Sequence, residues 1–493
     1  MLKKNKIIFL IFTVFFLIYP LLIILFNNFL LSIIVFTILT AVSFLLFKSK
    51  PIKINPRLVS YAPYIVFALA LLSRLIIVFF MNDKIIQISD FSKAFSRAND
   101  LNFSGDMYYQ IFSHWILYPN IIHNIFEVWG NSQLMALIFN ALCVSLSSVL
   151  IYQITYKIFK NYKIGLIGSL IYILWPSTSF YVLIFSPDHI AGLLLLISVY
   201  LYLIFNNSWT EKKCFYNVLI AFIIGIIIGI STFFKNFGPV LLIAIIIICL
   251  LEMIINKKNI LTIKKLGFVI IILISYIFSK NVTFNYIENL VGAKVGRNIT
   301  PIYLNVGLNS KSKGYYNNEV YSMYFNELRQ NNLNFGKTNN EIMKLLMFDI
   351  KSNYRGIPRM LYNKTITNFS TDNAKFNWVK NSVIDSQTDR VVFVIEKILK
   401  PLTNFHYVII IFCMTFMVVQ NYREKNLEIL LLSLIIFGAA AMLMLVEAQG
   451  RYRYAIEPFM CILAGAGIYY YKNFVGGILN EKIYKVNKTK TLS

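Results

Sequence analysis

The sequence predicts an all-α polytopic membrane protein with about twelve transmembrane helices and an external loop region of short helices. Of 493 residues, 58% are hydrophobic and 14% are charged, a composition that disfavours soluble domains. Apolar runs of about 20 residues, the length that crosses a bilayer core of roughly 30 Å, recur along the chain. Twelve are predicted to span: 7–26, 29–47, 61–82, 134–156, 164–181, 187–206, 216–233, 238–255, 266–280, 402–420, 427–446 and 455–471.

The distribution of basic residues predicts how these spans are oriented. The chain has 47 Lys and Arg against 22 acids, and alternate connections hold 23 of these bases on one side and six in the short loops on the other. Because basic loops stay in the cytoplasm, both termini are predicted to be cytoplasmic. Confinement of the bases to short connections also argues against nucleic-acid binding. The richness in Lys, Asn and Ile is typical of AT-rich bacterial coding, which favours a bacterial plasma membrane.

Four regions follow from the spans. Residues 1–60 form an N-terminal transmembrane hairpin, and 61–280 form a core whose first external loop covers 83–133. Residues 281–401 are polar and too long for a mere connector, so we expect short helices packed on the external membrane face. Residues 402–493 hold the last spans and a cytoplasmic tail.

The first external loop carries an acid at the water boundary. Asp90 lies in ISDFSKAF, a few residues beyond the third predicted span, where the chain is expected to turn into a short amphipathic helix. A carboxylate at that depth stays ionised and accepts a proton from a hydroxyl of a lipid-linked or external substrate. The alternative is structural, because Ser89, Asp90 and Ser92 are all good helix N-caps.

The same loop interleaves acids, histidines and aromatic residues. Asp106 is a candidate second acid, and Tyr108, Tyr109 and His114 are candidate contacts for an acceptor or a sugar ring. Anchoring at the membrane interface explains such aromatics equally well. The spacing of acids and histidines specifies no metal site.

Three further places hold charge where a predicted span meets the external side. Asp188 follows Pro187 at the tip of a tight hairpin, where it either faces the bundle or caps a helix. The external side, which has few basic residues, carries Lys235, Arg451 and Arg453. Guanidinium groups bind phosphate through bidentate hydrogen bonds. Interfacial anchoring is the alternative for each.

Several segments together resemble bacterial members of the GT-C glycosyltransferase superfamily, in the branch similar to dolichyl-phosphate-mannose protein mannosyltransferases. They lie in order between residues 61 and 472: SDF, YPNIIHNIFEVWG, LWPSTSFYVLIFSPDHIAGLLLLISVYLYL, YLNVGLNSKSKGYYNNE and EAQGRYRYAIEPFMCILAG. Each motif is short, and the resemblance depends on their order and on the predicted topology.

The resemblance implies roles for particular residues. It implies that Asp90 is the catalytic base and that Asp188 corresponds to the acidic residue that relatives carry in this hairpin. It also implies that Arg451 or Arg453 contacts the lipid phosphate. Asp90 is followed by Phe91, whereas relatives with paired acids have a second carboxylate there. A single-acid mechanism, or a second acid supplied by Asp106 or Asp188, is then required.

The implied reaction is an inverting sugar transfer. Asp90 would deprotonate an acceptor hydroxyl, which attacks a polyprenyl-phosphate sugar while Arg451, Arg453 and Lys235 stabilise the leaving phosphate. The expected partners are that donor, a glycan, protein or lipid acceptor, and the bilayer. No cofactor is predicted with certainty, and a divalent cation is the one candidate.

Other functions stay open at the level of sequence. A polysaccharide polymerase or ligase acting on undecaprenyl-diphosphate glycans also combines about twelve spans with a large late loop. It would be expected to use arginines with a histidine in that loop, and residues 281–401 contain no histidine. A lipid or glycan transporter would show matched halves with broken helices, and no such halves are evident.

Overall fold

The computed structural model describes residues 29–48, 56–208, 214–255, 260–384 and 390–490, so the predicted first span at 7–26 lies outside the described residues. The described chain is helical and has one isolated β-bridge. The helices are α2 (Phe29–Lys48), α3 (Pro56–Met81), α4 (Ser89–Asn99), α5 (Met107–Ile111), α6 (Leu117–Trp129), α7 (Gln133–Phe159), α8 (Tyr162–Ile173), α9 (Pro176–Tyr181), α10 (Asp188–Ser208), α11 (Cys214–Ser231), α12 (Gly238–Ile255), α13 (Ile260–Val291), α14 (Thr300–Gly307), α15 (Asn318–Gln330), α16 (Phe335–Asn353), α17 (Ile357–Phe369), α18 (Asn373–Ser382), α19 (Arg390–Val394), α20 (Lys400–Glu424), α21 (Leu427–Leu445) and α22 (Glu457–Lys490).

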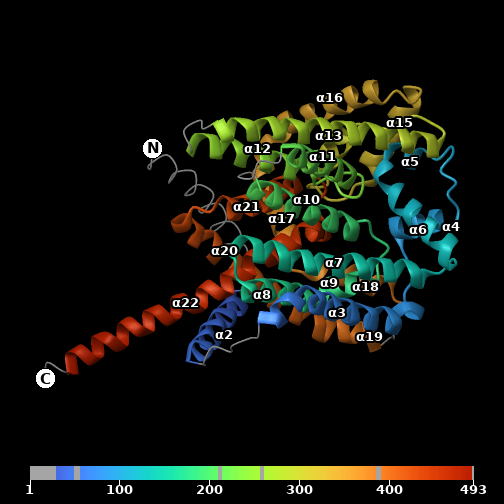
Figure 1. Ribbon diagram of the computed structural model, residues 1–493. Helices are drawn as coiled ribbons and strands as arrows, with labels where there is room; N and C mark the ends of the chain where they lie inside the picture. The colour runs from blue at the N-terminus through green and yellow to red at the C-terminus, as the bar shows by residue number, and fades with distance from the viewer. Residues whose placement is uncertain (1–28, 49–55, 209–213, 256–259, 385–389, 491–493) are drawn as a thin grey trace.

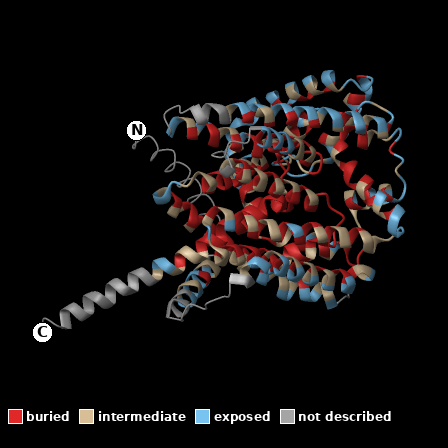
Figure 2. Cartoon of the chain, viewed as in Figure 1, coloured by how far each residue is buried: buried red, intermediate tan, exposed pale blue. Residues whose placement is uncertain are grey.

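The predicted fold class, an all-α polytopic membrane protein, is confirmed. Seven helices of the described chain are long and apolar enough to cross a bilayer, and three shorter apolar helices accompany them, so the count of twelve spans is not confirmed. Figure 1 shows α3, α7 and α13 extending along one axis of the bundle, with α4, α5 and α6 gathered at one end. Buried residues fill the centre and exposed ones lie at the periphery (Figure 2).

The predicted span at 164–181 is not one continuous helix. α8 ends at Ile173 after 12 residues, and α9 begins at Pro176. The residue before a proline is driven out of the helical region, and Trp175 is extended, with φ −75° and ψ 108°. The break thus precedes the hairpin that leads to Asp188 at the start of α10.

A small-residue seam joins α11 to α13. Gly225 and Gly229 form a GxxxG pattern, which is typical of close helix packing. A Cβ atom added at Gly225 would collide with Ser275 of α13, and one at Gly229 would lie 2.8 Å from Ser279. The pattern is therefore explained by close packing of the two helices.

The polar region predicted to contain short helices forms α14 to α18. α13 continues beyond the predicted end of its span at Lys280 and reaches Val291. α17 and α18 then pack on a 3₁₀ helix, η5 (Gly450–Ile456), that lies between α21 and α22. This return of the polar region onto the last loop brings residues far apart in the chain to one cavity.

Candidate active site

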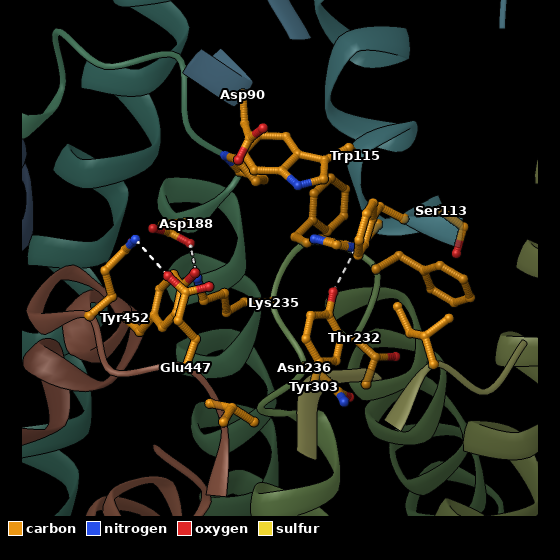
Figure 3. A pocket seen from close by; sticks show the side chains of 18 of the residues that line it. Asp90, Ser113, Trp115, Asp188, Thr232, Lys235, Asn236, Tyr303, Glu447 and Tyr452 are labelled. Atoms are coloured by element: carbon orange, nitrogen blue, oxygen red, sulfur yellow. Dashed lines mark hydrogen bonds and ion pairs between the residues drawn. The ribbon is translucent and has the colours of Figure 1, made fainter. Parts of the chain in front are cut away.

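A cavity of about 860 Å³ lies where the first loop, the hairpin, the polar region and η5 meet. Its lining includes Asp90, Asp188, Lys235, Glu447 and Arg451, which come from four separate segments. Figure 3 shows the first four of these side chains around one cavity. The cavity therefore gathers both carboxylates and cations, which a catalytic site for charged substrates requires.

Asp90 points into this cavity instead of capping its helix. α4 has Ile88 at its N-cap position and no side-chain cap hydrogen bond. The half-buried Asp90 carboxylate accepts a hydrogen bond of 3.0 Å from the Tyr108 hydroxyl. Burial and the adjacent carboxylate raise the pKa of Tyr108 above its ordinary value, so its hydroxyl stays a donor. The sequence alternative of an N-cap is not observed in this geometry.

The buried Asp188 and the half-buried Lys235 form an ion pair on another wall. The Lys235 ammonium lies 3.2 Å from the Asp188 carboxylate, which also accepts a 3.3 Å hydrogen bond from Tyr181. The same ammonium lies 4.0 Å from the ring centre of Tyr452. Burial lowers the pKa of Lys235, whereas Asp188 opposes that shift by favouring the charged form. The Lys235 side chain is paired but remains 21% exposed and lines the cavity, so an anion entering the cavity can reach its ammonium.

Arg451 is held by aromatic side chains. Its guanidinium carbon lies 4.7 Å from the ring centre of Phe91 and 4.4 Å from that of Trp378. Its Nε donates to Gln449, and the side chain is buried. Stacking of this kind leaves in-plane N–H groups as the route for binding an anion.

Glu447, Tyr303 and Tyr321 line the cavity but were not predicted from the sequence. The Tyr321 hydroxyl donates to Glu447 at 3.3 Å. Burial raises the pKa of Glu447, with Arg451 acting in the opposite direction. The signal available in the sequence was the position of Glu447, an acid two residues beyond α21 and four before Arg451.

His114 also lines the cavity, as a neutral group. Its Nδ1 lies 3.5 Å from the Tyr303 hydroxyl. Burial and nearby Lys235 lower the pKa of His114 to about 3, so the ring is uncharged at neutral pH. It can therefore exchange hydrogen bonds with a polar ligand without adding charge.

Three residues selected from the sequence do not line the cavity. Asp106 caps α5 by accepting from the Tyr108 backbone at 2.9 Å, and it pairs with Arg97 at 3.2 Å. The Tyr109 hydroxyl donates to the Lys93 carbonyl at 3.4 Å, and its pKa is raised to about 12 by burial. Arg453 points into a separate buried cluster.

That cluster, termed the buried charge network, consists of Asp372, Lys375, Arg453 and Glu457. Arg453 contacts Asp372 at 2.5 Å and Glu457 at 3.3 Å, while Lys375 contacts Glu457 at 2.5 Å and Asp372 at 3.2 Å. Burial raises the pKa of Asp372, but Lys375 and Arg453 outweigh it and lower the pKa below its usual value. All four side chains are internally compensated, so a phosphate has no open cation to bind here.

No metal cluster is evident in the part of the chain that the structure describes: no group of three or more His, Cys, Asp or Glu side chains is placed to bind one ion. The acids Asp90, Asp188 and Glu447 of the cavity instead accept hydrogen bonds from tyrosine hydroxyls, and Asp188 also pairs with Lys235.

The comparisons with known proteins agree with the motifs. Residues 113–279 match the family model described as dolichyl-phosphate-mannose-protein mannosyltransferase. The predicted resemblance is confirmed. The matched segment contains Asp188 and Lys235, but Asp90 precedes it and Arg451 follows it. No curated protein matches the chain.

Among solved structures, the chain is similar to archaeal oligosaccharyltransferases from Archaeoglobus fulgidus. One, AglB in complex with an inhibitory peptide and a dolichol-phosphate, is 9% identical at a TM-score of 0.46, over 88% of this chain and 52% of that one. Another, tethered to an acceptor peptide containing the NVT sequon, is 12% identical at a TM-score of 0.47, over 83% and 49%. The chain thus spans about half the length of these enzymes.

Proposed function

We propose that this protein is an integral membrane glycosyltransferase, moving a sugar from a polyprenyl-phosphate donor to an acceptor hydroxyl on the extracytoplasmic face. The observation that carries the proposal is the shared cavity, which presents Asp90 together with Lys235 and Arg451. The family match over residues 113–279 supports the same reaction class. The sugar donor would be this lipid and not a nucleotide sugar. Donor and acceptor would both enter from the membrane and the external side.

The donor phosphate would bind between Arg451 and Lys235. A polyprenyl phosphate carries its charge at the level of the headgroups, and both cations belong to loops at one end of the bundle. Asp188 would hold Lys235 in place through their 3.2 Å ion pair. As the bond to the sugar breaks, negative charge gathers on the leaving phosphate, and preorganised cations stabilise that charge.

Asp90 would act as the general base. The acceptor oxygen attacks the anomeric carbon from the face opposite the phosphate, its proton passes to the Asp90 carboxylate, and the phosphate departs with the electron pair, so the configuration inverts. Tyr108 would orient the carboxylate through its 3.0 Å hydrogen bond. His114 would contact the sugar or acceptor as a neutral hydrogen-bonding group.

The test compares Asp90→Asn with Asp100→Asn, a matched change in the same loop at a residue that does not line the cavity. Membranes containing each variant are given a polyprenyl-phosphate hexose labelled in the sugar, and transfer to membrane glycans is measured. Loss of a general base lowers the rate by about 10²–10⁴-fold. Equal transfer by Asp90→Asn and wild type would refute the proposed role, and activity only with a diphosphate-linked oligosaccharide would favour the polymerase or ligase.

A further inference from the structure

α18 connects the two halves of the proposed site. We infer that α18 acts as a strut, meaning a rigid element that fixes the position of Asp90 relative to Arg451. Trp378 is the positioning residue of this helix and acts through Arg451. This inference rests on the proposed function, because it assigns Arg451 to the donor phosphate. Three sets of contacts support it, one at each end of α18 and one at its middle.

The C-terminal end of α18 is tied to the segment that leads into α4. The Ile86 N–H donates to the Ser382 carbonyl at 2.8 Å, and the Ile384 N–H donates to the Lys84 carbonyl at 2.9 Å. Ile85 and Val383 form an antiparallel bridge between these bonds. Asp90 follows five residues after Ile85, so movement of this end of α18 would displace the carboxylate.

The N-terminal end of α18 is tied to η5 and α22 through the buried charge network. Asp372, which immediately precedes the helix, and Lys375, in its first turn, contact Arg453 and Glu457. Asp372 also accepts a 2.7 Å hydrogen bond from the Trp175 indole. Arg453 lies two residues after Arg451, so this network sets where the Arg451 backbone stands.

Between the two ends, Trp378 of α18 and Phe91 of α4 pack against the Arg451 guanidinium. The two rings meet edge to face, with 5.2 Å between their centres. Phe91 directly follows Asp90, so the residue that packs on the cation is the chain neighbour of the proposed base. The stack therefore links α18, the base and the phosphate-binding cation in one contact.

A charge network of this kind is a device for placement more than for stability. Burying four charges costs desolvation that their mutual attraction only roughly offsets, and an apolar core would often be at least as stable. What the network supplies is one allowed position, because Arg453 and Lys375 each need two specific carboxylates. The strut is thus fixed at both ends by directional contacts.

The experiment measures binding of undecaprenyl phosphate to the purified full chain in nanodiscs, beside steady-state transfer. Trp378→Leu keeps apolar bulk but removes the ring face, and we expect about tenfold weaker binding, within the range of a desolvated cation–π stack. Trp378→Phe restores a face and should bind within about threefold of wild type. Phe91→Leu, the second variant, should weaken binding to a similar extent.

Ile384→Pro tests the other half of the inference. It removes the N–H that bonds Lys84 and leaves the stack on Arg451, so kcat should fall about tenfold while the affinity for undecaprenyl phosphate stays unchanged. Val379→Ala is the matched control, because Val379 is a fully buried neighbour of Trp378. It should lower the melting temperature without either effect.

The outcomes separate the strut from the proposed function. If wild type does not bind undecaprenyl phosphate, or Arg451→Ala binds it equally well, the function assigned to this cavity is wrong. If Arg451→Ala loses binding while Trp378→Leu and Phe91→Leu bind within twofold of wild type, the strut is overturned and the function stands. An equal loss of affinity in Val379→Ala would also overturn it, because general destabilisation would then explain the result.

Discussion

Arg451 and Arg453 are two residues apart on one short helix, yet their surroundings differ: the charge of Arg453 is paired inside the protein, whereas Arg451 lines a cavity. Arg453 is saturated by Asp372, Glu457 and the Asn368 carbonyl. Arg451 is held mainly by ring faces and lines a cavity. In a 3₁₀ helix with three residues per turn, positions i and i+2 point in different directions. The two arginines show that charges paired inside the protein hold its structure together, whereas charges that face a cavity are available for chemistry.

The largest effect should come from breaking the compensated region. Arg453→Met leaves Asp372 and Glu457 buried with too few cations, and loss of one partner from a buried pair costs about 3–5 kcal/mol. We expect poor accumulation, or a strongly lowered melting temperature in detergent. A melting temperature equal to wild type would show that the network is not under this electrostatic constraint.

The counterpart in the cavity should leave stability alone and remove activity. Arg451→Met keeps apolar length between the rings of Phe91 and Trp378, so the melting temperature should stay close to wild type. Loss of one group that stabilises developing charge lowers kcat/KM by about 10²–10³-fold. Transfer from a labelled polyprenyl-phosphate sugar measures this. Retained activity together with lost stability would reverse the contrast between the two arginines.

The fold class was predictable because its physical signal is strong and local. Runs such as those in α7 and α12 are too apolar for water, and the bilayer thickness sets their length. The break before Pro176 also has a local signal, the proline itself, but the apolar residues on both sides led to the prediction of one continuous span over 164–181. The count of spans was less predictable, because a short apolar helix such as α8 has the composition of a span without its length.

The site was only partly predictable because cavity residues meet through tertiary packing. Asp90, Asp188, Lys235 and Arg451 stood out as charges beside apolar runs, and all four line the cavity. The same logic selected Arg453, since composition does not reveal which way a side chain points. Trp378 carried no signal at all, because its relation to Arg451 exists only after α18 has packed.

A smaller effect is expected from the ion pair inside the cavity. Asp188→Asn leaves Lys235 without its charge partner, and Lys235→Met leaves the buried Asp188 carboxylate unpaired. Paired buried groups couple by about 0.5–3 kcal/mol, so the double variant should be more stable than the sum of the single losses predicts. Melting temperatures of all four proteins measure the coupling. Strict additivity would mean that solvent in the cavity already compensates both charges.

The smallest effect concerns Glu447, where charge is tolerated but not compensated. Burial raises the pKa of Glu447 above its ordinary value, so between the unfolded and the folded pKa the folded state binds more protons than the unfolded chain. Stability from this group is therefore present at acid pH and is lost as pH rises through the folded pKa. Glu447→Gln, which keeps an oxygen for the Tyr321 hydroxyl, should raise the melting temperature at pH 7 by about 1–2 °C. The gap should close as pH approaches 4. A gap that widens toward acid would mean that Arg451 and Lys235 dominate over burial, placing Glu447 among the compensated charges.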